Sequence, residues 1–313
     1  MQSSSLFASA VTIVACCLAA CPVTAAMSSR GFYEDFEVVW GDDPHPERRV
    51  GVVDGGRVVM LTLNDISGSG FQSKDAFLFG EFTMAMKLVP GDSAGTVTTF
   101  YLTSKDPTAP GDGHDEIDFE FLGNVSGEPY LMQTNVFAQG VGNREQRSYL
   151  WFDPTEDFHN YTILWNPLNI IFSVDGTPVR VFSNHESEGL PYLSRQAMKL
   201  HATIWDGDSW ATRGGQDKTD WSHAPFVASY GTYAASACRS SVNSDGVSTF
   251  CCPSNAASGD GAWMTRRLGA DGERAMASAR EKYMVMDYCD DPWQMGVPAE
   301  CDIDRPVGHA ASR

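Results

Sequence analysis

The sequence predicts an all-β fold, an antiparallel β-sandwich followed by a short C-terminal extension that contains one helix. From about residue 32 to residue 226, short β-forming segments alternate with turn residues, mainly Gly, Pro, Asn and Asp. No helical pattern alternates with these segments, which argues against a βαβ fold. Asp175-Gly176 joins two β-rich runs, as the turn of a β-hairpin would.

The clearest β segments lie at residues 58–63, 82–88, 161–165 and 170–174, and the turns Asp54-Gly55-Gly56 and Pro90-Gly91-Asp92 flank others. After Ser229 the composition changes. Residues 230–274 are rich in Ala, Ser, Gly and Asp and are predicted to form loops, whereas residues 273–285 carry the one good helical pattern. This tail is too small for a core of its own, so we expect it to pack on the sandwich.

The N-terminal segment is predicted to be a signal peptide, residues 1–26. An apolar run from Leu6 to Cys21 precedes small residues suited to signal-peptidase cleavage, and the first charged residue is Arg30. The run is short and rich in Ala and Ser for a membrane anchor, which needs about 20 strongly apolar residues. The mature chain then divides into the sandwich, residues 27–229, and the C-terminal extension, residues 230–313.

The charge of the chain restricts its partners. The 22 basic and 40 acidic residues give a net charge of −18. Such a surface repels phosphate backbones and anionic lipid, so we expect no nucleic-acid and no membrane partner. A neutral polysaccharide is not repelled.

The cysteines of the mature chain all lie in its last quarter, at Cys238, Cys251, Cys252, Cys289 and Cys301. In an oxidising compartment such clustering indicates local disulfides. The spacing favours Cys238 with either Cys251 or Cys252, and Cys289 with Cys301. A zinc site is the alternative explanation, but the cysteines show neither a CxxC pair nor a flanking His pattern, so no metal is predicted.

The segment HDEIDFEFLG, from His114 to Gly123, contains the candidate chemistry. Glu116, Asp118 and Glu120 alternate with three apolar residues, so a strand here has one acidic and one apolar face. A solvated strand face is the simplest explanation. However, carboxylates stacked on one face repel one another, and neutral Ser or Thr would serve an exposed face better. The pattern makes chemical sense if the carboxylates share a proton and line a cleft.

The spacing of Glu116 and Glu120 suits a retaining glycosidase. Residues four apart on a strand have Cα atoms roughly 13 Å apart, at about 3.3 Å per residue. Side chains that lean toward each other could bring the carboxyl groups to roughly 5–5.5 Å, the separation in retaining enzymes. Crowding of like charges raises the proton affinity of at least one carboxyl group, as a general acid requires. Spacing alone does not say which Glu has which role.

The same ten residues resemble the active-site motif of plant xyloglucan endotransglucosylase/hydrolases, a branch of glycoside hydrolase family 16. The resemblance covers nearly the whole mature chain, through residues 67–82, 87–102, 133–137, 144–167, 202–215 and 282–289 and the later Cys301. It implies a curved, concanavalin-like β jelly roll with a long open cleft, and retaining chemistry without metal or cofactor. Residues 27–229 would then be the catalytic jelly roll and residues 230–313 the extension typical of this branch.

Carried over by position, the resemblance implies Glu116 as the nucleophile, Asp118 as its helper and Glu120 as the acid/base. Sugar rings expose C–H faces that stack on indole, which favours tryptophans in Gly/Asp-rich loops as substrate platforms. Together with the resemblance, this predicts substrate contacts at His114, Gln133, Asn135, Arg147, Trp205, Trp210, Gly214 and Gly215. Trp151 and Trp165, inside strand patterns, are expected in the core.

Two glycosylation sequons begin at Asn124 and Asn160. The first lies just beyond the catalytic strand, where the family often carries a glycan. The second enters a strand pattern, which leaves its use open. The tail departs from the family pattern, because no basic residue follows Cys289 in the segment from Asp290 to Gln294.

These features predict a secreted, monomeric enzyme of the cell wall and apoplast. It would cleave the β-1,4-glucan backbone of xyloglucan and transfer it to a xyloglucan or oligosaccharide acceptor. Two alternatives stay open: a predominant xyloglucan hydrolase, and a non-catalytic β-glucan-binding lectin, because a jelly roll does not fix function. The three carboxylates argue against the lectin, since a binder needs no stacked acids.

Overall fold

The computed structural model describes residues 25–26, 31–41, 49–105, 113–242, 248–252, 261–290 and 298–304. Most of the predicted signal peptide lies outside these ranges, and its last two residues form strand β1 (Ala25–Ala26), which pairs with β14 (Phe226–Val242). Among the helices of these ranges, none is long and apolar enough to cross a membrane.

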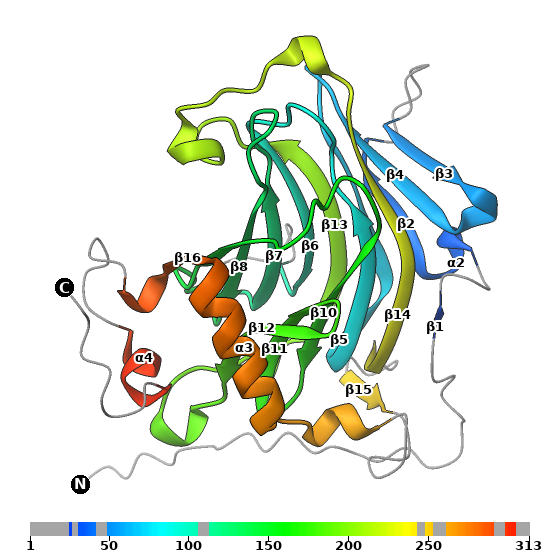
Figure 1. Cartoon of the computed structure of the whole chain (residues 1–313). Coiled ribbons are helices and arrows are strands. Elements are labelled where there is room, and N and C mark those ends of the chain that lie inside the picture. The colour runs from blue at the N-terminus through cyan, green and yellow to red at the C-terminus, as the bar shows by residue number, and fades with distance from the viewer. Residues whose placement is uncertain are drawn as a thin grey trace, which may run out of the picture.

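The strands form two curved layers that share the long strand β5 (Figure 1). The first layer, called the cleft sheet below, is ordered β2 (Phe36–Trp40), the first half of β5 (Ser69–Lys87), β13 (Met198–Asp206), β6 (Thr96–Thr103), β7 (Glu116–Leu122), β8 (Leu131–Phe137), β9 (Gln146–Tyr149) and β16 (Met284–Asp287). The second layer, the outer sheet, contains β3 (Val50–Val53), β4 (Val58–Leu63), β14, the second half of β5, β10 (His159–Trp165), β11 (Asn169–Val174) and β12 (Thr177–Ser183), with β15 (Ser248–Cys251) paired to the end of β14.

The long strand β5 connects the two sheets. Its residues 69–77 pair with β13, whereas its residues 80–86 pair with β10. The pairings between the described strands are antiparallel, as the sequence predicted. Helices are few and short: α2 (Phe32–Asp35), α3 (Ala270–Tyr283), α4 (Ala299–Asp304) and the 3₁₀ turns η1 (Asp54–Gly56), η2 (Glu186–Glu188), η3 (Thr212–Gly215), η4 (Trp221–His223), η5 (Ala262–Thr265) and η6 (Tyr288–Asp290).

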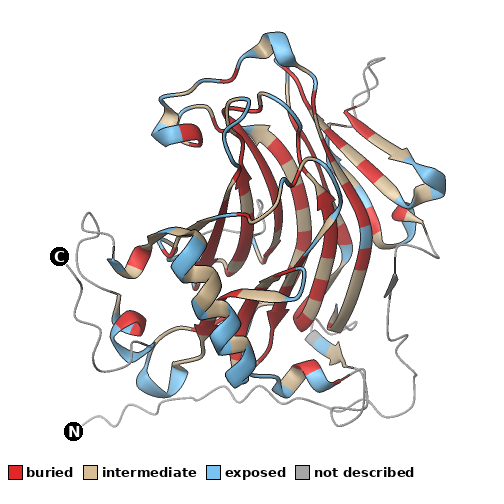
Figure 2. Ribbon diagram, in the orientation of Figure 1, coloured by how far each residue is buried: buried red, intermediate tan, exposed pale blue. Residues whose placement is uncertain are grey.

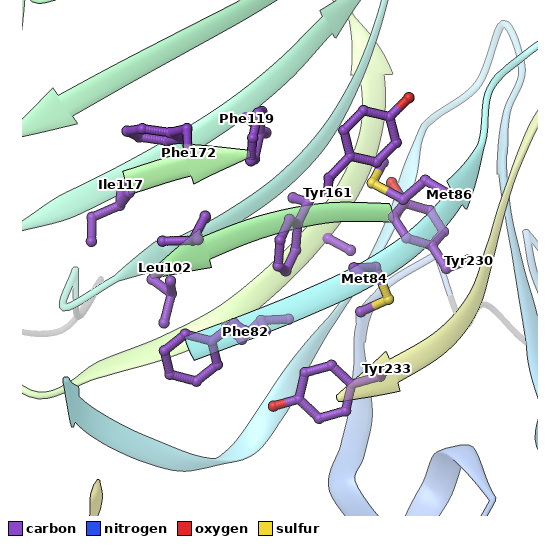
Figure 3. Close-up of a cluster of buried hydrophobic side chains, with 14 of the residues drawn as sticks. Phe82, Met84, Met86, Leu102, Ile117, Phe119, Tyr161, Phe172, Tyr230 and Tyr233 are labelled. Atoms are coloured by element: carbon purple, nitrogen blue, oxygen red, sulfur yellow. The ribbon is translucent and has the colours of Figure 1, made fainter. Parts of the chain in front are cut away.

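The hydrophobic core lies between the sheets, and Figure 2 shows buried residues running along the strands of both. Figure 3 shows its centre, where Phe119 of β7 packs against Tyr161 of β10 and Phe172 of β11. The ring centroid of Phe119 lies 5.8 Å from that of Tyr161 and 5.2 Å from that of Phe172. Burying each such side chain stabilises the fold by about 1.5–3 kcal/mol, so β7 is held firmly between its neighbours.

The predicted strands agree with the structure. Strand β4 has the predicted bounds, the segments 161–165 and 170–174 fall within β10 and β11, and the segment 82–88 lies in β5 except for its last residue. Val174 pairs with Thr177, and Asp175 and Gly176 between them have φ of 48° and 75°. A two-residue hairpin of type I′ requires these positive values, so the predicted turn is confirmed.

The prediction of loops for residues 230–274 is wrong in its first part. Residues 230–242 continue strand β14, which pairs with β5, and residues 248–251 form β15. The small residues that suggested a loop fit a close sheet contact: a side chain at Gly80 would meet the Cβ of Ala237 at 2.5 Å. Burial of Tyr230 and Tyr233 and the long pairing with β5 override the loop-like composition. The predicted helix is present as α3.

The C-terminal extension packs on the sandwich, as predicted. Helix α3 packs on β12 (Figure 1), and β16 extends the cleft sheet beyond β9. One disulfide joins Cys238 to Cys252, which decides between the two predicted partners, and the other joins Cys289 to Cys301 as predicted.

A buried ion pair also fixes the extension. Arg144, in the loop between β8 and β9, has its Nε 2.5 Å from Oε1 of Glu300 in α4. Both side chains are at least nine-tenths buried, and Glu300 directly precedes the disulfide-bonded Cys301. On the other side of the same loop, the backbone N–H of Tyr288 donates to the carbonyl of Glu145 at 3.0 Å. The extension therefore holds this loop at two points.

We expect Glu300→Ala to destabilise the protein by about 3–5 kcal/mol, because it leaves the Arg144 guanidinium buried without its partner charge. Glu300→Gln should cost less, since its amide oxygen can still accept from Nε. Urea unfolding measures both free energies, with Glu281→Ala on the exposed side of α3 as the control. Equal midpoints for Glu300→Ala and Glu281→Ala would show that the pair does not anchor the extension.

Candidate active site

The three predicted carboxylates lie on β7, in the middle of the cleft sheet. Ile117, Phe119 and Phe121 are completely buried in the core, so Glu116, Asp118 and Glu120 project from the opposite face. The predicted acidic and apolar faces are therefore present. Glu116 and Glu120 are partly exposed, whereas Asp118 between them is only 6% exposed.

The acidic face opens into a cleft of about 530 Å³. Its lining combines predicted residues with residues that the sequence did not single out: Thr99, Tyr101, Lys105, Glu116, Asp118, Glu120, Gln133, Asn135, Phe137, Glu145, Arg147, Thr203, Trp205 and Trp210. The structure thus brings Gln133, Asn135, Arg147 and the two tryptophans together with the carboxylates.

Strand register places these side chains in rows across the sheet. Glu120 pairs with Thr99 of β6 on one side and with Gln133 of β8 on the other, and Gln133 pairs in turn with Arg147 of β9. The row through Asp118 runs from Tyr101 on β6 to Asn135 on β8. Because paired residues on antiparallel strands face the same side, both rows lie on the floor of the cleft.

Hydrogen bonds along the Glu120 row fix its side chain. The Gln133 amide donates from Nε2 to Oε2 of Glu120 at 2.5 Å, and Arg147 donates from Nε to Oε1 of Gln133 at 2.6 Å. Arg147 therefore influences Glu120 through the Gln133 amide. These two hydrogen bonds include no direct ion pair between Arg147 and Glu120. Glu120 is oriented while its negative charge is only partly compensated.

The row through Asp118 is fixed by hydrogen bonds to the loop that the C-terminal extension holds. Asn135 donates from Nδ2 to Oε1 of Glu145 at 3.1 Å and accepts at Oδ1 from the backbone N–H of Arg144 at 3.1 Å. Arg144 is the residue that pairs with Glu300. The position of Asn135 beside Asp118 thus depends on the loop that the extension holds.

Burial and crowding raise the proton affinity of this cluster. The pKa of Asp118 is raised well above its ordinary value, first by burial and then by the charges of Glu116 and Glu120. Burial also raises the pKa of Glu120, against the hydrogen bond from Gln133, and Glu145 and Glu116 raise it further. The cluster therefore retains a proton at pH values where ordinary carboxyl groups are ionised, as general acid catalysis requires.

The neighbouring polar rings contribute no positive charge near neutrality. His201 of β13 stacks on Tyr101 with ring centroids 5.0 Å apart, and burial lowers the pKa of His201 to about 4. Burial and the nearby carboxylates raise the pKa of Tyr101, which stays protonated. The stacked rings of Tyr101 and His201 are thus uncharged near neutral pH.

His114 and the predicted tryptophans border the carboxylates. Nε2 of His114 lies 3.9 Å from Oε2 of Glu116, and its ring stacks on Phe137 of the cleft lining. Trp205 and Trp210 lie with ring centroids 6.0 Å apart and form an aromatic wall.

The other predicted positions lie outside this lining. Trp165 is completely buried and Trp151 packs against the core, as expected. Gly214 and Gly215 do not line the cleft. They shape the loop after Trp210: a side chain at Gly215, where φ is 83°, would meet the carbonyl oxygen of Ser209 at 2.2 Å.

The sequence did not single out Glu145. It is in a loop, where no strand alternation indicates which way a side chain points, and only its hydrogen bond with Asn135 reveals its place. Of the two sequon residues, Asn124 is partly buried and donates from Nδ2 to the carbonyl of Pro129 at 3.0 Å, whereas Asn160 at the start of β10 is exposed.

Comparison with known proteins identifies relatives of this arrangement. The family profile described as "Glycosyl hydrolases family 16" matches residues 32–223, and the one described as "Xyloglucan endo-transglycosylase (XET) C-terminus" matches residues 258–301. The chain is 47% identical over 288 residues to Xyloglucan endotransglucosylase protein 1 of Diospyros kaki, covering 91% of this chain and 93% of that protein. It is 52% identical over 278 residues to Xyloglucan endotransglycosylase/hydrolase protein 8 of Oryza sativa subsp. japonica, covering 88% and 91%.

Solved structures agree on the fold of the sandwich. A prokaryotic β-1,3-1,4-glucanase (lichenase) derived from a mouse hindgut metagenome superposes with a TM-score of 0.52 and 25% identity, covering 68% of this chain and 98% of that chain. The Bacillus licheniformis β-glucanase superposes with a TM-score of 0.54 and 22% identity, covering 68% and 97%. The predicted jelly-roll fold is confirmed.

We expect Asp118→Asn to stabilise the protein at neutral pH. Because the pKa of Asp118 is raised in the folded protein, its stabilising effect is complete below the unfolded pKa of about 4 and is lost as the pH rises through the raised value. Asparagine cannot ionise and avoids that loss. Urea unfolding should therefore show a gain in the free energy of unfolding at pH 7 and little gain at pH 4.

The control for this prediction is Asp157→Asn, which changes an exposed aspartate outside the cleft. Its stability should follow the wild type at both pH values. A difference between Asp118→Asn and wild type that did not grow from pH 4 to pH 7 would contradict the assigned proton affinity.

Proposed function

Because the chain belongs to glycoside hydrolase family 16, in the branch that carries the xyloglucan endo-transglycosylase C-terminus, we propose that it cleaves the β-1,4-glucan backbone of xyloglucan and re-joins it to another chain. The observation that carries the proposal is the set of three carboxyl groups on β7 that face an open cleft, with the pKa of Asp118 and of Glu120 raised by burial. By name, one of the two relatives compared above is a xyloglucan endotransglucosylase and the other a xyloglucan endotransglycosylase/hydrolase, and the chain covers more than nine-tenths of each.

The two partly exposed glutamates take the two roles of a retaining mechanism. Glu116 attacks the anomeric carbon and forms a glycosyl-enzyme ester, while Glu120 gives its proton to the departing sugar oxygen. Glu120 then accepts a proton from the incoming hydroxyl group, which displaces Glu116 from the anomeric carbon. The raised pKa of Glu120 and its fixed position on Gln133 suit the acid role.

Asp118 serves the nucleophile. It lies between the glutamates, is buried, and its pKa is raised well above the ordinary value. In its protonated form it can donate a hydrogen bond to a neighbouring carboxylate and spread the charge that Glu116 carries. It therefore assists formation and breakdown of the glycosyl-enzyme ester without contacting the glycosidic bond that is cleaved.

Transfer rather than hydrolysis requires that a sugar hydroxyl competes with water for the ester. An acceptor bound in attack geometry gains the advantage of positioning, which compensates for the abundance of water. The wall of Trp205 and Trp210 and the polar groups of Arg147 and Glu145 provide binding surface beside the carboxylates. Predominant hydrolysis is the second candidate, because acidic Asp290 follows Cys289 where the family pattern has a basic residue.

We further propose that the protein works as a secreted monomer in the cell wall, with a glycan on Asn124. The extracellular setting is supported by the disulfides Cys238–Cys252 and Cys289–Cys301, which persist in oxidising compartments. Asn124 is on the loop after β7 and is partly exposed. The exposed Asn160 is a second candidate for modification.

We expect Glu116→Ala to abolish formation of the glycosyl-enzyme, because it removes the carboxylate that attacks the anomeric carbon in the proposed mechanism. Glu120→Ala should retain slow cleavage of substrates with good leaving groups, which need no acid. For both variants, a reducing-end assay measures cleavage of xyloglucan, and release of the phenol measures cleavage of an aryl glycoside with a good leaving group. Glu128→Ala, which changes an exposed glutamate, is the control and should match the wild type. Wild-type rates for Glu116→Ala would exclude it as nucleophile.

We expect product balance to favour transfer. With polymeric xyloglucan and excess labelled oligosaccharide, label should enter polymer as fast as backbone bonds are cut, because the acceptor outcompetes water for the ester. Size-exclusion chromatography follows the label, and a reducing-end assay follows hydrolysis. Reducing ends that accumulate at the rate of cleavage, with little label transferred, would make the enzyme a hydrolase.

A further inference from the structure

Trp40 lies on the floor of the cleft sheet, on the edge strand β2, at the opposite edge from β16. Strand β2 pairs with β5, and after a register shift Trp40 pairs with Gly70. Gly70 pairs with Thr203 of β13, Thr203 with Thr99 of β6, and Thr99 with Glu120. Trp40 therefore ends the same row of paired residues that contains the candidate acid/base.

Between Trp40 and Glu120, only short side chains project from the floor of the cleft sheet. Its side chains belong to Thr203 and Thr99, whose hydroxyl groups bond to each other at 2.7 Å, and Gly70 has none. The lining of the cleft described above already includes Thr99 and Thr203. The path from the carboxylates toward Trp40 is thus continuous with that cleft and is not crossed by a large side chain in this row.

The indole of Trp40 is held against the sheet while remaining open to solvent. Its Nε1 donates to Oγ of Ser67 at 3.0 Å, and a side chain at Gly68 would meet its Cη2 at 2.9 Å and the carbonyl oxygen of Ile204 at 2.1 Å. Only glycine at position 68 leaves room for the ring. Nevertheless 39% of the surface of Trp40 is exposed, in a fold that buries Trp165 and Trp263 almost completely.

We propose that Trp40 is an outlying platform for a glucosyl unit of the xyloglucan backbone, at the edge of the cleft sheet opposite β16. Four strand spacings of about 4.8 Å place β2 roughly 19 Å from β7, which corresponds to several sugar units from the reacting bond. A pinned, exposed indole offers a rigid apolar face for the C–H side of a sugar ring. This inference rests on the proposed function, since it assumes a glucan chain in the cleft.

Trp40 would then act on long chains more than on short ones. A chain that spans the row gains the contact with Trp40, whereas a chain too short to reach β2 does not. We expect Trp40→Ala to raise KM for polymeric xyloglucan roughly three- to tenfold, the effect of losing one aromatic contact, and to change kcat much less. Trp40→Phe, which keeps a ring but loses the bond to Ser67, should fall between wild type and Trp40→Ala.

The experiment uses the full chain with xyloglucan substrates of graded backbone length, varied first as donor and then as acceptor. The loss in kcat/KM for Trp40→Ala should appear only above a threshold length in one of the two series. Phe158→Ala, which removes another exposed aromatic, on the outer sheet beside Gly231, is the matched control and should show no dependence on length. An equal loss at all lengths, or none, would overturn the proposal.

Binding separates this inference from the proposed reaction. Titration calorimetry with long and short xyloglucan oligosaccharides on Glu116→Ala, with and without Trp40→Ala, requires no turnover. A loss of affinity confined to the long oligosaccharide supports the platform even if the wild type proves inactive on xyloglucan. Unchanged affinity for both overturns it, even if the wild type is a transglucosylase. Thermal unfolding shows whether Trp40→Ala folds, and Trp40→Phe carries the test if it does not.

Discussion

The site depends on the two-residue period of strand β7. Ile117, Phe119 and Phe121 enter the core, and that burial fixes the opposite direction for Glu116, Asp118 and Glu120. A slip of one residue would send the carboxylates into the core and the aromatic rings into the cleft, so the register is strongly specified. The apolar face also supplies the free energy, about 1.5–3 kcal/mol for each large side chain, that offsets the cost of crowding like charges on the other face.

The same two-residue alternation applies to strand β8, which lies beside β7 in the cleft sheet. Gln133 and Asn135 face the cleft, whereas Thr134 between them faces the core and accepts at its carbonyl and hydroxyl oxygens from Nη1 of buried Arg180, at 2.9 and 3.0 Å. The guanidinium of Arg180 lies over the ring of Tyr288, a residue of the C-terminal extension. The C-terminal extension therefore packs behind β8, whose amide side chains orient the acids. It supports the site from behind and does more than provide surface to which a sugar could bind.

The local parts of this arrangement could be predicted from sequence and the long-range parts could not. Alternation within residues 116–121 gave the acidic face, and Asp175-Gly176 gave the hairpin, because both depend on neighbouring residues alone. Ala and Ser around Ala237 suggested a loop, since composition does not reveal the pairing of β14 with β5. Glu145 was missed because its place is set by a hydrogen bond to a residue ten positions away. The role proposed for Trp40 requires four successive strand pairings, which no local pattern records.

The charge of the cleft follows from its chemistry and limits what can enter. Its described lining includes the carboxyl groups of Glu116, Asp118, Glu120 and Glu145, against the basic side chains of Lys105 and Arg147. Carboxylates must be close to share protons, so an acidic field at the reacting bond cannot be avoided. An anionic polysaccharide would meet that field along the cleft, whereas a neutral glucan gains stacking and hydrogen bonds without a charge penalty. If Glu116 and Glu120 act as proposed, the carboxylates that carry out the reaction also favour a neutral chain.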